Sequence, residues 1–424
     1  ITVGGTSLVL KPVEGSSLFE ENDSSSSKKP RSTSILFLIS IFHIVAAIEP
    51  FILNLKVDIN KFMPILGFVL LSWVFLFVSK VILRRVTFEV EAMALFLSGL
   101  GIVLISNANL NQAYIQLVAN AIGIILFCII VKFIEKLDRV MKWRIFIAVA
   151  AVLLFALNLV LGKEIYGSKN WIILGPVSIQ PSELVKIAFI FVGASTLESL
   201  QTTKNLTGYI AFSAICIGSL FLMKDFGTAC IFFIVFLVIA FMRSGSIRTV
   251  ILSCAAAALG AFIILKFKPY VADRFAVWGN VWAHSSDSGF QQTRVLTYSA
   301  SGGLFGVGVG SGRLKNVFAS ASDLMFGMIC EEMGLIIALV VALGIAFFSF
   351  YVRVQSNKSR SVFYFIAAGG AAALMIFQAS LNIFGATDIL PLTGVTLPFV
   401  SLGGSSIISV WGLLAFIKAC DERT

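Results

Sequence analysis

Apolar runs of about 20 residues recur along most of this 424-residue chain. An α-helix needs about that length to cross the roughly 30 Å hydrocarbon core of a bilayer. The hydrophobic fraction of 58% and the charged fraction of 13% exclude a soluble domain, which is roughly 45–50% apolar and about 25% charged. Segments of about ten residues with alternating polarity, typical of a membrane barrel, do not recur. We therefore expect an all-α, polytopic integral membrane protein.

Twelve segments are candidates for membrane spans. Lysine and arginine concentrate in every second connection, starting with the N-terminal segment, and are sparse in the others. Because cytoplasmic loops are enriched in these residues, both chain ends are expected on the cytoplasmic side. The candidate spans cover residues 35–53, 62–83, 90–106, 114–134, 145–162, 182–200, 207–223, 227–242, 247–267, 324–352, 362–385 and 398–419.

The net charge of +10 does not indicate nucleic-acid binding, because the basic residues form short clusters between the apolar runs. Topology explains these clusters better. The cysteines stand singly and form no CxxC pair, so we interpret them as small buried residues rather than redox or metal-binding groups. They are Cys128, Cys216, Cys230, Cys254, Cys330 and Cys420.

The N-terminal segment, residues 1–34, differs from the rest of the chain. Residues 1–15 alternate apolar with small or polar side chains, as a pair of β-strands would. They faintly resemble the last strands of a forkhead-associated phosphopeptide-binding domain, and an unstructured leader is the alternative. The serine-rich, charged residues that follow have the composition of a flexible linker. We expect a cytoplasmic segment here, with further residues upstream of Ile1.

One long polar connection, residues 268–323, faces the outside in this topology. Connections between helices in compact bundles are usually much shorter, which favours a functional loop. Residues 282–292 within it read WAHSSDSGFQQ and hold one of the chain's two histidines.

Polar residues interrupt the apolar pattern at two helix starts. In QPSELVK, residues 180–186, Glu183 and Lys186 stand three residues apart on one helix face, where they can form an ion pair. A functional pair inside the membrane and a simple capped helix at its edge both fit. In MKDFGTAC, residues 223–230, Asp225 and Thr228 either line a polar cavity or belong to a tight hairpin.

Three further stretches follow. The glycine-rich residues 301–313 lack the GK[ST] of a P-loop, so nucleotide binding is not expected. In SDLMFGMICEEMG, residues 322–334, the adjacent carboxylates of Glu331 and Glu332 need a cation, for which the candidates are Arg274, Arg294 and Lys186. Residues 390–406, LPLTGVTLPFVSLGGSS, form a broken stretch of the kind that lines a cavity or packs against protein.

These stretches together resemble the SEDS family of cell-wall and sporulation proteins, the FtsW, RodA and SpoVE group. WIxLG, QPSExxK, DFGT, SGGLFGxG, SDLMF with EEMG, and LPLTGVxLPFVSxGGSS occur in the family's order. The resemblance covers about residues 90–419, which include ten of the twelve spans. It implies a SEDS-like transmembrane domain over residues 84–424, preceded by two extra helices in residues 35–83.

The resemblance implies a peptidoglycan glycosyltransferase in the bacterial cytoplasmic membrane. Such enzymes polymerise lipid II, an undecaprenyl-pyrophosphate-linked disaccharide, on the outer face, usually with a class B penicillin-binding protein, for elongation, division or sporulation. Cations would bind pyrophosphate, and carboxylates would bind sugar hydroxyls or a divalent ion such as Mg²⁺ or Mn²⁺. The substrate-binding positions it implies are Trp171, Glu183, Lys186, Asp225, Thr228, Arg274, Gln291, Asp323, Glu331 and Ser401.

The outer loop departs from the family pattern. The family typically carries DPxxDPxGxGYQ, whose second aspartate is the catalytic carboxylate, whereas this chain has NVWAHSSDSGFQ with His284 at that position. The nearest acid is Asp287, three residues later. His284 can be the base, Asp287 can replace the missing acid, or neither acts. In the last case the chain is a scaffold that binds a lipid-linked precursor and regulates a partner synthase. Transport of lipid II is a further alternative.

Overall fold

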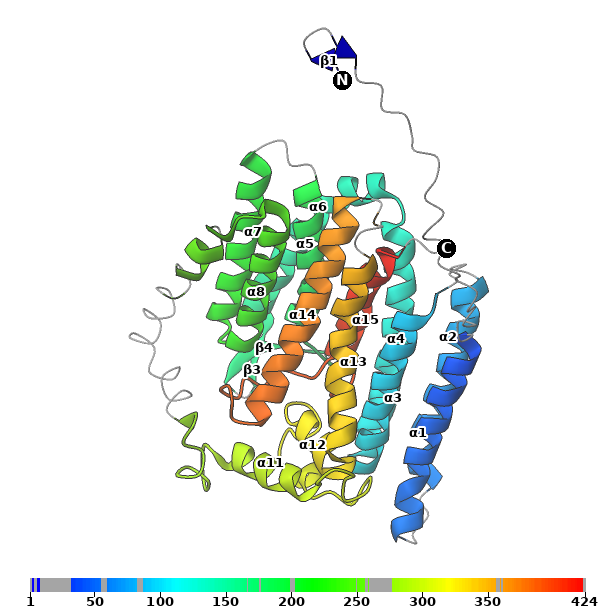
Figure 1. The fold of residues 1–424 in the computed structure, drawn as a ribbon. Helices are drawn as coiled ribbons and strands as arrows, with labels where there is room; N and C mark the ends of the chain where they lie inside the picture. The colour runs from blue at the N-terminus through cyan, green and yellow to red at the C-terminus, as the bar shows by residue number, and fades with distance from the viewer. Residues whose placement is uncertain are drawn as a thin grey trace.

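The computed structural model describes residues 2–3, 6–7, 32–54, 59–81, 87–165, 167–174, 177–198, 203–248, 250–255, 258, 277–355, 359 and 361–421. Within these ranges, eight helices are long and apolar enough to cross a membrane. Together they form one bundle (Figure 1), so the expected all-α, polytopic class is confirmed. Seven of the eight are α1 (Ser32–Asn54), α2 (Ile59–Val81), α3 (Glu89–Ala108), α4 (Leu110–Ile134), α5 (Leu137–Leu161), α8 (Phe226–Ser244) and α13 (Gly334–Gln355).

The eighth is α14 (Val362–Ala386), and shorter elements complete the bundle. A small antiparallel sheet, in the order β3-β4-β5, lies between α5 and α6 in the chain. Further helices within the described ranges are α6 (Pro181–Glu198), α7 (Thr203–Leu222), α11 (Phe290–Ser301), α12 (Met325–Glu332), α15 (Gly404–Ala419) and the 3-10 turn η1 (Leu314–Asn316). The strands are β1 (Thr2–Val3), β2 (Thr6–Ser7), β3 (Lys163–Ile165), β4 (Ser168–Leu174) and β5 (Val177–Ile179).

Helix α15 is the centre of the bundle and packs against α4, α6 and α14. A helix that is apolar all round is buried on all sides, and this holds for most of α15. Trp411 is fully buried and makes edge-to-face contacts with Phe75 and Phe399. Its indole N–H donates to Asn120 Oδ1 at 3.0 Å, which satisfies the one polar group that its burial removes from water.

The span expected over residues 324–352 is divided in two. Helix α12 ends at Glu332, and α13 begins at Gly334, whose φ is 82°. A Cβ at Gly334 would overlap the backbone of Leu304 and Gly306, so only glycine fits this break. The carboxylates of Glu331 and Glu332 therefore precede the long apolar helix. Most of the span expected over residues 247–267 lies outside the described residues.

The two ends of the bundle carry different polar contacts. At one end, Lys418 of α15 forms an ion pair with Glu91 of α3 at 2.9 Å, and both side chains are fully buried. At the other end, Gly310 packs against Asn107 near the last turn of α3. Helices α11 and α12 lie at that second end (Figure 1), which is the end of the expected outer loop.

The two N-terminal helices pack as a hairpin on the outside of α3 and α4. His43 of α1 is buried, and its Nε2 lies 3.1 Å from the carbonyl oxygen of Phe96 in α3. The imidazole ring rests on Gly99, one turn further along α3, where a Cβ would overlap it. The hairpin thus docks through a polar contact and a close helix approach.

Replacing Gly99 by valine is expected to separate α1 from α3 and to lower the apparent melting temperature of the detergent-solubilised protein. The added side chain has no free volume beside the His43 ring, and overpacking usually costs about 1–3 kcal/mol. Gly218→Val on α7 is the matched control, because a Cβ there meets no atom within 4 Å. Equal melting temperatures for the two variants would contradict this docking contact.

Candidate functional site

The expected ion pair between Glu183 and Lys186 forms on the first turns of α6. Lys186 Nζ lies 2.7 Å from Glu183 Oε1, with 1% and 6% of the two side chains exposed. Lys186 also donates to Gln378 Oε1 of α14 at 2.9 Å. Glu183 Oε2 is buried and accepts no hydrogen bond from the residues that the structure describes. A buried carboxylate oxygen in this state is ready to accept a hydrogen bond from a ligand.

A polar chain continues from this pair into the broken stretch before α15. The Gln378 amide donates to the carbonyl oxygen of Thr396 at 3.0 Å, and the Thr396 hydroxyl lies 2.7 Å from Ser406 Oγ. Residues 391–397 have no regular secondary structure. Irregular backbone inside a membrane bundle is tolerated where protein groups satisfy its hydrogen bonds. The α14 amides do so here, because Asn382, one turn from Gln378, donates to the carbonyl oxygen of Val395.

Asp225 and Thr228 form the N-terminal cap of α8. The Asp225 carboxylate accepts the Thr228 N–H at 3.1 Å, a normal capping contact. It also accepts a hydrogen bond from Asn170 of β4. Asn170 in turn donates to Ser182 Oγ at 2.9 Å, beside Glu183. Two motifs that are more than 40 residues apart in the chain are thus joined by one buried asparagine.

The same broken stretch contacts Asp323 and Ser401. Ser401 Oγ donates to the carbonyl oxygen of Ser322 at 2.6 Å, and Asn382 donates to the carbonyl oxygen of Asp323 at 2.9 Å. Burial raises the pKa of the Asp323 carboxyl. Residues 393–406 therefore collect the motifs around Glu183, Asp225, Asp323 and Ser401 at one place, since Gly227 of α8 also packs against Thr393 and Val395.

The outer-loop island takes the form of consecutive turns over residues 281–289. His284 Nδ1 lies 3.8 Å from Asp287 Oδ1, with 38% and 68% of the two side chains exposed. Gly289 packs under the loop against the carbonyl oxygens of Val281 and His284. The two residues that the sequence offered as alternatives are therefore direct neighbours.

The remaining expected positions lie elsewhere. Gln291 of α11 donates to the carbonyl oxygen of Phe318 at 2.9 Å. Trp171 is half-buried on β4, opposite Lys163 of β3. Arg274 lies outside the described residues. Within the described ranges, no three His, Cys, Asp or Glu side chains gather as metal ligands, and the possible divalent ion stays an expectation.

Among the described residues, Glu331 is held by backbone groups and not by a side-chain cation. Its two oxygens accept the N–H groups of Arg313 and Leu314 at 2.7 and 2.9 Å. Lys186 pairs with Glu183, and the guanidinium of Arg294 lies over the ring of Phe290. Neither of these two cations contacts the Glu331 or Glu332 carboxylate among the described residues. Backbone N–H groups of the glycine-rich segment bind both carboxylates, and the charge of Lys315 also acts on Glu332.

Glu332, on α12 and outside the long apolar helices, provides a pH-dependent contact. Its Oε2 accepts the Gly310 N–H at 2.8 Å. Burial raises the pKa of this carboxyl to about 7, and the Gly310 hydrogen bond and the charge of Lys315 only partly oppose that effect. Because the folded-state pKa lies above the ordinary value, protonation of Glu332 stabilises the folded protein.

The stabilising effect of protonation should be complete below about pH 4.5 and disappear as the pH rises through 7. We expect the melting temperature of the solubilised protein to fall over this range, and Glu332→Gln to flatten the fall. Thermal unfolding at pH 5, 6, 7 and 8 measures it, with the exposed Glu135→Gln as the matched control. An unchanged slope in Glu332→Gln would contradict the assignment.

Sequence reasoning missed several polar residues of the site. Gln378 and Asn382 connect α14 to Lys186, to Asp323 and to the broken stretch. The sequence does contain a signal for these two residues, because two amides four residues apart on one face of an apolar span need hydrogen-bond partners. Asn170 had no such signal, since its partners come from α5, α6 and α8.

Comparison with known proteins assigns a family to this arrangement. The model of the FtsW, RodA and SpoVE family of cell cycle proteins matches residues 92–424. The chain belongs to this family, which confirms the resemblance read from its motifs. Helices α1 and α2 precede the matched region.

Individual relatives agree with this family assignment. A probable peptidoglycan glycosyltransferase FtsW of Buchnera aphidicola is 31% identical over 272 residues, which are 62% of this chain and 77% of that protein. The peptidoglycan glycosyltransferase RodA of Mycobacterium tuberculosis is 26% identical over 355 residues, covering 76% and 75%.

Two solved chains show that the fold is shared. The rod shape determining protein RodA of Thermus thermophilus has a TM-score of 0.57 and 23% identity, covering 78% of this chain and 95% of its own. A chain from a peptidoglycan synthase complex, described for the coordination of polymerization and crosslinking, has a TM-score of 0.67 and 24% identity, covering 78% and 96%.

Proposed function

We propose that this chain is a membrane-embedded peptidoglycan glycosyltransferase that polymerises lipid II. The observation that carries the proposal is the convergence of the family's motifs on residues 393–406, around the buried pair of Glu183 and Lys186. Burying charged groups inside a membrane bundle is costly, and such groups are usually retained for function. Membership of a family with glycosyltransferase relatives supports the same reaction.

The buried polar groups suit a lipid-linked disaccharide. Three buried oxygens around the convergence point, Glu183 Oε2, Asn382 Oδ1 and Thr393 Oγ1, have no hydrogen-bond partner within the described chain. Such acceptors can receive hydrogen bonds from sugar hydroxyls. Lys186 supplies a cation for a phosphate. Trp171, Asp225, Thr228, Arg274, Gln291, Asp323, Glu331 and Ser401 complete the proposed substrate-binding set, directly or by positioning the loops.

His284 is the proposed general base, and Asp287 orients it. Asp287 lies beside Nδ1 of the imidazole. When Nδ1 carries the proton, Nε2 is free to accept another, as in other histidine–aspartate pairs. The 3.8 Å separation is longer than a hydrogen bond, and catalytic contacts often tighten only when substrate binds. In this proposal, His284 and Asp287 act together as a base and its orienting group and are no longer alternatives.

The proposed step is a displacement at the donor sugar. Nε2 of His284 takes the proton from the acceptor sugar hydroxyl as its oxygen attacks the anomeric carbon. The bond from that carbon to the lipid-linked pyrophosphate breaks, and the pyrophosphate leaves with the bonding electrons. A divalent ion, Mg²⁺ or Mn²⁺, would stabilise the charge of this leaving group.

The proposed arrangement places this chemistry outside the cell. The distribution of lysine and arginine supports cytoplasmic chain ends and an outer loop over residues 268–323. Residues 1–34 are then a cytoplasmic segment, 35–83 an additional hairpin, and 84–424 the catalytic domain. A class B penicillin-binding protein is the proposed partner, and the peptidoglycan synthase complex that contains a similar chain supports this.

A scaffold without activity is the second candidate, favoured by the histidine at the family's aspartate position. His284→Asp separates the two candidates. If the chain is a scaffold, this substitution restores the missing acid, and polymerisation of lipid II appears only in the variant. We expect polymerisation by the wild-type chain in nanodiscs, and no gain in His284→Asp. Activity confined to the variant would overturn the proposed enzyme.

A further inference from the structure

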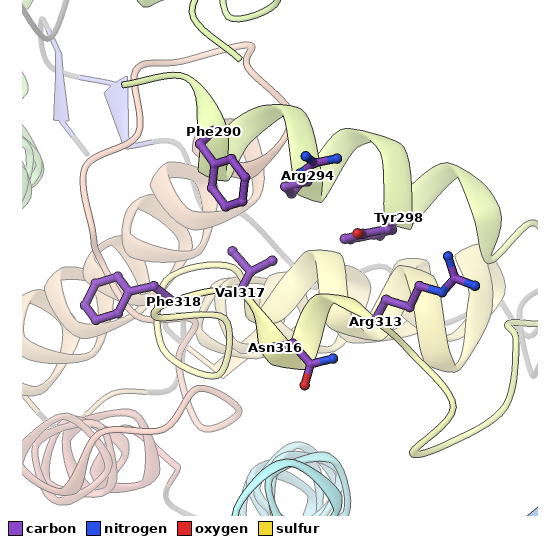
Figure 2. A pocket seen from close by; sticks show the side chains of 7 residues that line it. All are labelled: Phe290, Arg294, Tyr298, Arg313, Asn316, Val317 and Phe318. Atoms are coloured by element: carbon purple, nitrogen blue, oxygen red, sulfur yellow. The ribbon is translucent and has the colours of Figure 1, made fainter. Parts of the chain in front are cut away.

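A cavity of about 570 Å³ lies beside the outer loop, between α11 and the segment that contains η1. Figure 2 shows its lining: side chains of α11 lie on one side and Val317 points toward them from the following segment, whereas the Asn316 side chain points away from α11. Its volume is within the usual range for small-ligand sites. The lining residues are Phe290, Arg294 and Tyr298 of α11, and Arg313, Asn316, Val317 and Phe318.

The cavity combines positive charge with aromatic surface. Arg294 and Arg313 are its two cations, and no carboxylate is among its described lining residues. Neither guanidinium forms an ion pair within the part of the chain that the structure describes. The Arg294 guanidinium lies 5.0 Å from the centre of the Phe290 ring, a cation–π contact that leaves its N–H groups able to donate.

Buried contacts fix both walls of the cavity. Helix α11 packs closely on α12, because Gly327 receives the side chain of Val295. The opposite wall is held by Glu331, which accepts the N–H groups of Arg313 and Leu314. Glu331 is 2% exposed. The backbone that carries the two arginines is therefore fixed before a ligand binds, which reduces the conformational entropy lost on binding.

The cavity also adjoins the proposed base. Phe290, its first lining residue, follows Asp287 by three positions. The amide of Gln291 donates to the carbonyl oxygen of Phe318 across the two walls. The backbone N–H of Phe290 donates to the carbonyl oxygen of Asp287 at 3.2 Å, so the cavity begins beside the His284–Asp287 pair.

We propose that this cavity binds an anionic saccharide, in which a sugar ring carries an attached phosphate or carboxylate. The two guanidinium groups bind the oxyanion by charge-assisted hydrogen bonds. The aromatic rings of Phe290 and Tyr298 pack against the sugar. The proposal rests on the proposed function for its ligand. The oxyanion comes from the lipid-linked pyrophosphate or from stem-peptide carboxylates on the new glycan strand.

Binding to the full chain in nanodiscs tests this proposal. The probes are lipid II, soluble uncross-linked glycan fragments with stem peptides, and neutral chito-oligosaccharides. Arg294→Ala and Arg313→Ala are expected to weaken binding of an anionic probe by about tenfold each, and binding of the neutral probe much less. The matched control is Arg248→Ala, an exposed arginine remote in the chain from the cavity.

The binding results distinguish the two possible sources of the oxyanion from each other and from the absence of a binding site. Weakened binding of lipid II alone assigns the site to the lipid pyrophosphate, and weakened binding of the fragments alone assigns it to the strand; both support the proposal. Variants that bind every probe as Arg248→Ala does would overturn it. Polymerisation is measured separately. If the wild-type chain polymerises lipid II but the arginine variants bind every probe normally, the cavity proposal fails and the proposed function stands. If binding depends on the arginines but the wild-type chain does not polymerise lipid II, the proposed function fails and the cavity proposal stands.

Discussion

His284→Ala is expected to lower the rate of lipid II polymerisation by about 10² to 10⁴, the usual contribution of a general base. The motif resemblance predicts that the imidazole takes the place of the family's aspartate, and its Nδ1 lies 3.8 Å from Asp287 Oδ1. No other described residue of the 281–289 turns besides Asp287 carries a titratable side chain. Initial rates with labelled lipid II, measured at saturating substrate, give the effect on catalysis.

Matched variants of the same loop separate catalysis from loop structure. Asp287→Asn should lower the rate less than His284→Ala, because it disturbs the orientation of the base and leaves the base itself. Ser286→Ala, another exposed position on these turns, should retain the wild-type rate. A wild-type rate in His284→Ala would show that this histidine is not the base, and an effect of equal size in Ser286→Ala would indicate only a loop defect.

Lys186→Met is expected both to destabilise the protein and to abolish polymerisation. The substitution leaves Glu183 buried without its cation, and breaking a buried ion pair from one side costs about 3–5 kcal/mol. It also removes the contact between Lys186 and Gln378 that joins α6 to α14. Thermal unfolding in detergent and the polymerisation assay measure the two effects.

A double variant separates stability from function at this pair. Glu183→Gln with Lys186→Met removes both charges, so no uncompensated buried charge remains and most of the melting temperature should return. Polymerisation should not return, because the cation and the carboxylate proposed to bind substrate are both absent. Recovery of activity together with stability would show that the pair is only structural.

Features set by local pattern could be predicted from the sequence. The apolar runs gave the membrane class, and the spacing of Glu183 and Lys186 gave their ion pair. The ordered motifs gave the family. Each depends on neighbouring residues or on helix periodicity, which a single chain displays directly.

Features set by packing between distant segments could not be predicted from the sequence. The break at Gly334 depends on the backbone of Leu304 and Gly306, and the pair of Glu91 and Lys418 joins residues 327 positions apart. Two of the expected cations for Glu331, Arg294 and Lys186, lie elsewhere, and backbone N–H groups bind this carboxylate. Such backbone donors have no side-chain signal in the sequence. Gln378 and Asn382 were visible as polar residues in an apolar helix, but their partners were not.

The conversion of labelled lipid II into glycan strands by the purified wild-type chain tests the central claim most directly. The assay is run in nanodiscs with Mg²⁺ or Mn²⁺, with and without a cognate class B penicillin-binding protein, and the products are separated by length on a gel. The proposed function predicts strands of many disaccharides that a muramidase digests, and none with Lys186→Met. Unchanged lipid II under all of these conditions, from a wild-type chain that melts cooperatively, would contradict it.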